Sequence, residues 1–77
     1  MIKVYSKHNC PQCKMLKKQL DANNIEYQEI NIDEQPEFRD YLKERGWQAA
    51  PVVESEIADF AGFNPKEIRE LIKAYKQ

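Results

Sequence analysis

The sequence predicts a small α/β domain in which a four-stranded mixed sheet packs against three helices, in the order β-α-β-α-β-β-α. Short segments rich in β-branched and aromatic residues alternate with longer segments whose apolar residues recur at helical spacing. A strand, a helix and a second strand in succession form a right-handed crossover between parallel strands. The last two predicted strands are joined by a short turn, so they must be antiparallel.

The first strand and the first helix occupy the N-terminal part of the chain. Residues 2–5 form a strand, because this run is rich in residues that favour β-structure. The helix begins with Cys10-Pro11-Gln12-Cys13, and Cys13, Leu16 and Leu20 recur on its inward face. It ends near Asn23-Asn24, because asparagine tolerates the left-handed backbone that commonly ends a helix.

The second strand and the second helix follow. Residues 27–32 alternate apolar and polar side chains, as a half-buried strand does. The second helix begins at Asp33, has Pro36 in its first turn and ends at Gly46. Its buried stripe is predicted to consist of Phe38, Tyr41 and Leu42.

Two short strands and a last helix complete the predicted domain. Residues 51–54 and 57–60 form the third and fourth strands, with Ser55-Glu56 as the turn between them. Asn64 caps the last helix, and Pro65 occupies its first position, where the missing N–H has no cost. The apolar face of this helix is predicted to consist of Ile68, Leu71, Ile72 and Tyr75.

Length and composition limit the possible functions. The 77 residues are enough for one domain, which we expect to cover residues 1–77. The net charge of −1 gives no bulk attraction to nucleic acids or anionic membranes. No apolar run approaches the roughly 20 residues of a membrane span, and the first residues lack the apolar stretch of a signal peptide. We therefore expect a monomeric, cytoplasmic protein.

The chain has two cysteines, Cys10 and Cys13, separated by two residues. A secreted disulfide scaffold would contain more cysteines at wider spacing, and a bridge across so short a loop stabilises a fold little. At the start of a helix, unpaired N–H groups and the helix dipole stabilise a thiolate. The pattern therefore predicts thiol–disulfide exchange. Cys10 would be the exposed nucleophile, and Cys13, turned toward the interior, would resolve the mixed disulfide.

Neighbouring residues leave other interpretations open. Residues 1–20 carry five lysines and no acid, which indicates either a solvated surface or a positive rim that favours the thiolate. Lys7 is either an ordinary loop lysine or a contact to the thiolate or to an anionic ligand. The two cysteines could also be buried structural residues. Together with His8 they could hold part of a metal site, although a closed tetrahedral site needs four ligands.

Three segments carry a resemblance to a known family: Val4-Tyr5-Ser6-Lys7-x-x-Cys10-x-x-Cys13, Ala49-Ala50-Pro51-Val52-Val53 and Phe60-Ala61-Gly62-Phe63-x-Pro65. They resemble the thioredoxin superfamily and, more closely, the NrdH redoxins, which are glutaredoxin-like proteins. The resemblance implies a thioredoxin-like fold and a dithiol electron carrier rather than a stand-alone metabolic enzyme. It also implies a redox-active disulfide with no other cofactor and no metal, reduction by thioredoxin reductase, and electron transfer to class Ib ribonucleotide reductase.

The resemblance also implies the residues of the site. Cys10 and Cys13 correspond to the catalytic pair, and Pro51 corresponds to a proline that the superfamily holds in cis opposite that pair. There it exposes backbone for pairing with a substrate strand. Phe60-Ala61 stands where the family usually has Trp-Ser, and Asn64 where it has Arg, which bears on partner choice. The residues expected to contact substrates or partners are Lys7, Gln12, Ala50, Pro51, Gly62 and Phe63.

Two alternative functions are considered beside this one. The first is a glutathione-dependent glutaredoxin that reduces mixed disulfides between proteins and glutathione. Such proteins usually have a Gly-Gly-x-x-Asp turn before the last helix, whereas residues 61–65 contain no acid. The second alternative is a metal or iron–sulfur binding module that uses Cys10 and Cys13 in a dimer.

Overall fold

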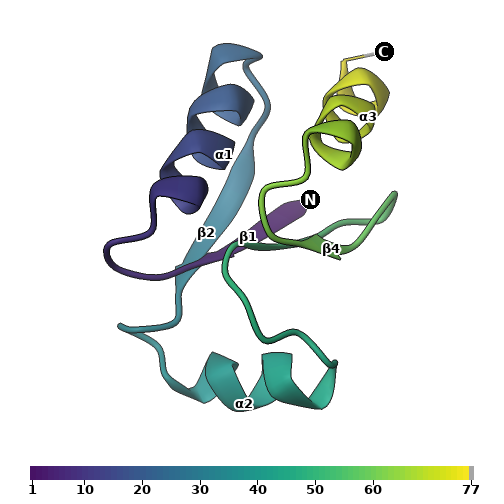
Figure 1. The fold of residues 1–77 in the computed structure, drawn as a ribbon. Coiled ribbons are helices and arrows are strands. Elements are labelled where there is room, and N and C mark those ends of the chain that lie inside the picture. The colour runs from purple at the N-terminus through teal and green to yellow at the C-terminus, as the bar shows by residue number, and fades with distance from the viewer. Residues whose placement is uncertain (77) are drawn as a thin grey trace.

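A four-stranded sheet with the strand order β2-β1-β3-β4 lies at the centre of the computed structural model, which describes residues 1–76. The predicted element order and the mixed sheet are confirmed (Figure 1). The strands are β1 (Ile2–Ser6), β2 (Tyr27–Asn31), β3 (Val52–Glu54) and β4 (Phe60–Ala61). The helices are α1 (Pro11–Ala22), α2 (Glu37–Glu44) and α3 (Pro65–Tyr75).

Strand β1 pairs with a neighbour on each side. It runs parallel to β2 and antiparallel to β3, and β3 is antiparallel to β4. Across the β1–β3 pair, Tyr5 lies opposite Val52 and Val4 lies opposite Val53. Because β1 and β3 run in opposite directions, the C-terminal end of β1 lies next to the N-terminal end of β3.

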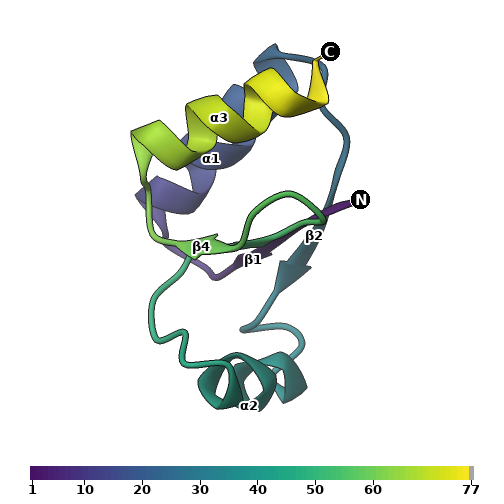
Figure 2. The same ribbon diagram turned by 90° about the vertical axis from the view of Figure 1, so that its right-hand side faces the viewer.

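The helices form two layers around the sheet. Helices α1 and α3 lie on one face and α2 lies on the other (Figure 2). Successive side chains of a strand point to opposite faces. Val4 and Val53 therefore pack with α1 and α3, whereas Tyr5 and Val52 pack with Leu42 of α2. No helix within residues 1–76 combines the length and the apolar character that a membrane crossing requires.

The predicted starts of α1 and α3 are confirmed. Cys10 is the N-cap of α1 and Asn64 is the N-cap of α3, and a proline follows each of them. The side chain of Asn64 accepts a hydrogen bond from the N–H of Glu67 over 3.3 Å. Helix α1 ends at Ala22, and Asn24 follows with a left-handed φ of 56°. Local side-chain chemistry therefore determines both ends of α1.

The predicted start of α2 at Asp33 is wrong, since the helix begins at Glu37. The side chain of Asn31 accepts hydrogen bonds from the N–H groups of Asp33, at 2.9 Å, and Glu34, at 3.3 Å. This side-chain turn replaces the first helical hydrogen bonds. Pro36 consequently lies just before the helix rather than inside its first turn.

The predicted buried stripe of α2 is correct in part. Leu42 is buried, and Phe38 packs at the edge of the cluster around Tyr5. Tyr41 is 38% exposed, because it lies at the rim of the cluster and its hydroxyl donates a hydrogen bond to Glu54 over 2.8 Å. Of the predicted apolar face of α3, the first two residues are buried and the last two are partly buried: Ile68, Leu71, Ile72 and Tyr75.

The predicted fourth strand over residues 57–60 is also misplaced, because β4 covers Phe60–Ala61. The hydroxyl oxygen of Ser55 accepts hydrogen bonds from the N–H groups of Ile57, at 3.2 Å, and Ala58, at 3.0 Å. It also donates to the carbonyl of Ala58 over 2.8 Å. These bonds lengthen the turn, and Ile57 is left 54% exposed.

Candidate redox site

The two cysteines form a disulfide at the N-terminal end of α1. Strand β1 brings the chain to this end of the molecule, and residues 7–9 connect it to Cys10. Residues 10 and 13 are about one helical turn apart, which places their Cα atoms 5.2 Å from each other. This separation lies within the range that a disulfide spans without backbone movement.

Cys10 combines the role of helix cap with that of a redox residue. Its sulfur accepts a hydrogen bond from the backbone N–H of Cys13 over 3.1 Å. Its carbonyl accepts the first helical hydrogen bond, from the N–H of Lys14 over 3.1 Å. A negative charge on this sulfur would therefore lie at the positive end of the helix dipole and next to an N–H donor. Both effects favour a thiolate once the disulfide is reduced.

The expectation that Cys10 is exposed is not met in this disulfide form. Cys10 is 6% exposed and Cys13 is 1% exposed, so both cysteines are buried. The bond between the two sulfurs covers part of each atom. Of the two, Cys10 is the more exposed.

The loop between β1 and α1 contacts the turn that follows β2. The N–H of His8 donates a hydrogen bond to Oδ2 of Asp33 over 2.8 Å. Nε2 of His8 lies 3.7 Å from Oε2 of Glu34, and the two form an ion pair when the imidazole is protonated. The N–H of His8, together with the guanidinium of Arg39, holds the pKa of Asp33 below its ordinary value. Asn9, next in the loop, has a left-handed φ of 55°.

Pro51 directly precedes β3, at the end of the sheet where β1 also ends. The peptide bond between Ala50 and Pro51 is cis, as the resemblance implies. Continuing the antiparallel β1–β3 register by one residue places Pro51 beside Ser6. The carbonyl of Pro51 accepts a hydrogen bond from the N–H of Gly62 over 2.7 Å. Gly62 has a φ of 79°, which glycine adopts without the clash that a Cβ atom causes.

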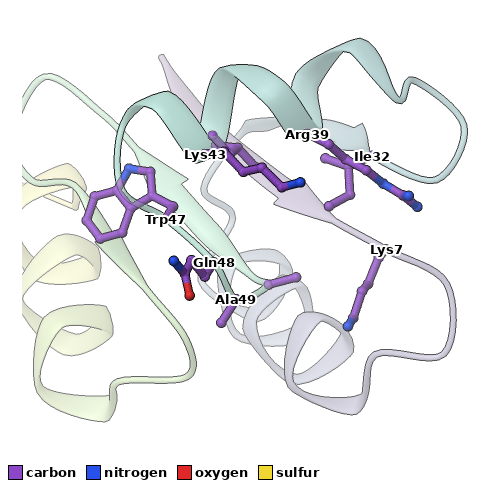
Figure 3. A pocket seen from close by; sticks show the side chains of 9 residues that line it. Lys7, Ile32, Arg39, Lys43, Trp47, Gln48 and Ala49 are labelled. Atoms are coloured by element: carbon purple, nitrogen blue, oxygen red, sulfur yellow. The ribbon is translucent and has the colours of Figure 1, made fainter.

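A cavity of about 470 Å³ lies beside the loop that leads to the disulfide. Lys7 of this loop and Ala50 both line the cavity. Arg39 and Lys43 reach it from α2, and Trp47 closes the side away from Lys7 (Figure 3). The cavity thus combines positive charge with apolar walls. The other lining residues are Ile32, Leu42, Gln48 and Ala49.

The structure brings several residues singled out from the sequence into one region. Lys7 and Ala50 share the cavity, and Pro51 and Gly62 are joined by a hydrogen bond. Gln12 is exposed in the first turn of α1. The remaining residue, Phe63, is partly buried and packs against the cluster between the sheet and helices α1 and α3.

Arg39 and Lys43 were not singled out from the sequence. They are four residues apart, so they lie on the same face of α2. That spacing was a usable signal, but it did not show that the face turns toward Lys7. Arg39 and Lys43 lie near Lys7 because of the way α2 packs on the sheet, opposite α1. Only the tertiary structure determines this packing.

A metal site within one chain needs several ligand side chains close together. Within residues 1–76, histidine, cysteine and acidic side chains do not assemble in groups of three or more that could hold a metal ion. His8 is turned toward Glu34 and does not complete a ligand set with the two cysteines.

Comparisons with known proteins agree with this geometry. The glutaredoxin family model matches residues 2–56. The chain is 52% identical over 71 residues to the glutaredoxin-like protein NrdH of Lactococcus lactis subsp. cremoris, which covers 92% of this chain and 99% of that protein. It is 31% identical over 70 residues to the NrdH of Salmonella typhimurium, covering 91% of this chain and 86% of the relative.

A solved structure shows the same arrangement of elements. The glutaredoxin-like NrdH-redoxin of Escherichia coli superposes with a TM-score of 0.86 at 30% identity, covering 91% of this chain and 92% of that one. The predicted thioredoxin-like fold is thereby confirmed. With a disulfide-forming cysteine pair in such a fold, the protein is a thiol–disulfide oxidoreductase. The chain belongs to the glutaredoxin family and, within it, to the glutaredoxin-like proteins of the NrdH type.

Proposed function

We propose that this protein is a cytoplasmic dithiol electron carrier that thioredoxin reductase reduces and that donates electrons to a class Ib ribonucleotide reductase. The observation that carries the proposal is the Cys10–Cys13 disulfide at the N-terminus of α1, in a chain similar to NrdH proteins over most of its length. In this role Cys10 and Cys13 are the catalytic residues. The carrier works as a monomer.

The first step transfers two electrons from the dithiol to the partner. The thiolate of Cys10 attacks one sulfur of the partner's disulfide, and a new bond joins Cys10 to that sulfur. The partner's other sulfur leaves as a thiolate and takes up a proton. Cys13 then loses its proton and attacks the sulfur of Cys10, which releases the second partner thiolate. The partner ends as a dithiol, and the carrier ends as the Cys10–Cys13 disulfide.

The second step regenerates the carrier. A dithiol of thioredoxin reductase, which NADPH keeps reduced, attacks the Cys10–Cys13 disulfide by the same exchange chemistry. Two electrons pass from NADPH through the reductase to the carrier, and the two carrier thiols take up protons. Each turnover therefore consumes one NADPH and forms one dithiol in the partner. The rate of NADPH oxidation thus measures the complete electron transfer from NADPH to the partner.

The surface around the disulfide supplies the contacts to both partners in this proposal. Ala50 lines the cavity together with Lys7, and its backbone and that of Pro51 would pair with an extended strand of the partner. Gln12 is exposed one residue before Cys13 and would contact the partner's chain on the other side. The proposed contact residues are Lys7, Gln12, Ala50, Pro51, Gly62 and Phe63.

Two observations support thioredoxin reductase as the electron source. The NrdH-redoxin of Escherichia coli has been described as having a thioredoxin-like activity profile. In this chain the turn before α3 offers no acid, and the side chain of Asn64 there is engaged in capping the helix. This turn therefore lacks the acid that usually helps to hold glutathione in glutathione-dependent glutaredoxins.

A second candidate function has one observation in its favour. The cavity beside the disulfide presents Lys7, Arg39 and Lys43, and three cations suit a ligand with carboxylates, such as glutathione. On this alternative the protein would reduce mixed disulfides between proteins and glutathione. The missing acid near Asn64 counts against it.

A coupled assay separates the two candidates. The oxidised protein is mixed with NADPH and either thioredoxin reductase or glutathione with glutathione reductase, and NADPH oxidation is followed with a disulfide substrate. The proposal expects turnover with thioredoxin reductase. Turnover with glutathione and its reductase alone would overturn it in favour of the second candidate. The acceptor is tested by adding class Ib ribonucleotide reductase and measuring deoxyribonucleotide formation, with Cys10→Ser as the inactive control.

A further inference from the structure

We propose that Asp33 is a positioning residue whose carboxylate holds the loop of residues 7–9, so that Cys10 keeps its place at the N-terminus of α1. The proposal rests on the function proposed above, in that it takes Cys10 as the nucleophile. Asp33 lies in the turn between β2 and α2, far from Cys10 in the sequence. Its side chain contacts His8, in the loop before Cys10, and Arg39, which lines the cavity.

The two carboxylate oxygens of Asp33 have different partners. Oδ2 accepts the N–H of His8 over 2.8 Å, and Oδ1 is paired with the guanidinium of Arg39. The side chain of Asp33 is 24% exposed, so most of it is covered. One carboxylate therefore connects the loop before Cys10 with a residue that lines the cavity beside the disulfide.

The loop has little packing of its own to hold it. Lys7, His8 and Asn9 are all exposed, so none of the three side chains is enclosed in the core. Asn9 also adopts a left-handed φ of 55°, which costs a residue with a side chain more than an extended backbone does. The hydrogen bond from His8, the middle residue, restricts the backbone of this loop to the conformation that leads into the cap residue Cys10.

Asp33 is itself held in place from two sides. Its N–H donates a hydrogen bond to Oδ1 of Asn31 over 2.9 Å, at the end of β2. Arg39, in the first part of α2, holds the opposite side of the carboxylate. The acceptor offered to His8 is therefore attached to the end of a strand and to a helix, both of which lie outside the loop.

Positioning matters for the chemistry because thiolate stabilisation depends on distance. The sulfur of Cys10 accepts the N–H of Cys13 over 3.1 Å, and a hydrogen bond to a charged acceptor weakens steeply as it lengthens or bends. If the loop shifts, Cys10 moves with it and the thiolate loses part of this stabilisation. The thiol then ionises at higher pH, and less thiolate is present at neutral pH.

Two variants of equal charge separate this role from an effect of charge. Asp33→Ala removes the acceptor for His8, whereas Asp33→Asn keeps an oxygen acceptor with the same loss of charge. Removing a negative charge near Cys10 would by itself favour the thiolate. A positioning role requires Asp33→Ala to be less reactive than Asp33→Asn, although the two have equal charge.

The measurement is the pH dependence of Cys10 alkylation in the reduced protein, with iodoacetamide as the probe and mass spectrometry to identify the labelled cysteine. We expect Asp33→Ala to react about three- to tenfold more slowly at neutral pH than Asp33→Asn, with its profile moved to higher pH. Equal profiles for Asp33→Ala and Asp33→Asn would overturn the proposal.

A second measurement needs no variant and covers the case in which Asp33→Ala does not fold. The amide proton of His8 lies in an exposed loop, yet the hydrogen bond to Asp33 should slow its exchange with solvent in the wild-type protein. Exchange at the rate of an unstructured peptide would contradict the proposal. Alkylation and amide exchange involve no reductase, so neither result depends on which electron source the coupled assay identifies.

Discussion

The sulfur of Cys10 and the backbone N–H of Cys13 form a hydrogen bond of 3.1 Å within the segment that also closes the disulfide. Because the N–H belongs to the backbone, it stays in place when the sulfur–sulfur bond is broken. The group that would stabilise the Cys10 thiolate is therefore present before reduction takes place. The N-terminus of α1, which begins at Pro11, adds its positive potential at the same sulfur.

The order of attack can be tested by trapping. Cys13→Ser leaves Cys10 able to attack a partner disulfide but removes the thiol that releases the partner, so a mixed disulfide should accumulate. Non-reducing electrophoresis with mass spectrometry measures this product. Cys10→Ser is the matched control and should trap little. If Cys10→Ser accumulates the mixed disulfide and Cys13→Ser does not, the two roles are reversed.

The cap of α3 is expected to contribute to stability. Asn64→Ala removes the acceptor for the N–H of Glu67 and should lower the free energy of unfolding by about 1 kcal/mol. Denaturant unfolding of the reduced and the oxidised protein measures this change. Asn64→Asp keeps a capping oxygen and is the control, so it should remain close to the wild type. A loss of stability in Asn64→Asp as large as that in Asn64→Ala would show that the cap does not explain the effect.

A buried polar cluster joins the far end of β3 to α2. Glu54 accepts hydrogen bonds from the hydroxyls of Tyr5 and Tyr41, each over 2.8 Å, and is paired with Arg45. Burial and the hydrogen bond to Glu54 raise the pKa of Tyr5 well above its ordinary value. Tyr5 should therefore stay protonated at a pH that ionises an exposed tyrosine, and titration of tyrosine absorbance tests this.

Removing the donor and removing the acceptor of this hydrogen bond should lower the free energy of unfolding by different amounts. Tyr5→Phe removes one hydrogen bond and should cost about 1 kcal/mol. Glu54→Ala leaves the buried hydroxyl of Tyr5 without its acceptor and should cost about 2–3 kcal/mol. The double variant should be less destabilised than the sum of the two, because the second change removes a group that the first left unpaired. Additive costs from unfolding experiments would contradict the direct contact.

Acid should weaken the fold through Glu29. Hydrogen bonds from Lys17, at 2.6 Å, and Ser6, at 2.7 Å, hold the pKa of Glu29 below its ordinary value of 4.5. Since the folded state favours the carboxylate, this stabilisation is present above pH 4.5 and is lost as the pH falls through the lowered pKa. Glu29→Gln should therefore flatten the dependence of stability on pH in this acidic range. An unchanged slope in unfolding experiments would exclude this role.

Local chemistry made much of the fold predictable. The starts of α1 and α3 were predicted because a capping residue and a proline stand side by side in the sequence at each start. The start of α2 and the fourth strand were misplaced because single side-chain oxygens, those of Asn31 and Ser55, accept several N–H groups and replace regular hydrogen bonds. Such turns depend on which rotamer a polar side chain adopts, and residue spacing does not show it.

The site was predictable to the extent that it is local. Cys10 and Cys13 were found from their spacing, and the cis bond before Pro51 followed from the family resemblance. Arg39 and the role of Asp33 depend on contacts between the β2–α2 turn and the loop before α1. These segments are more than twenty residues apart in the sequence. No pattern within either segment indicates the contact.

The central position of β1 has a consequence for how the protein can open. This strand has hydrogen-bonded neighbours on both edges, and its residues Val4 and Tyr5 are buried under opposite helix layers. Segments at the periphery, such as the turn over residues 55–59, can unfold locally at low cost, whereas β1 is released only when the whole fold is lost. A protease or a chaperone that engages a peripheral turn therefore meets a molecule in which β1, the strand that leads to the redox loop, is still paired on both sides.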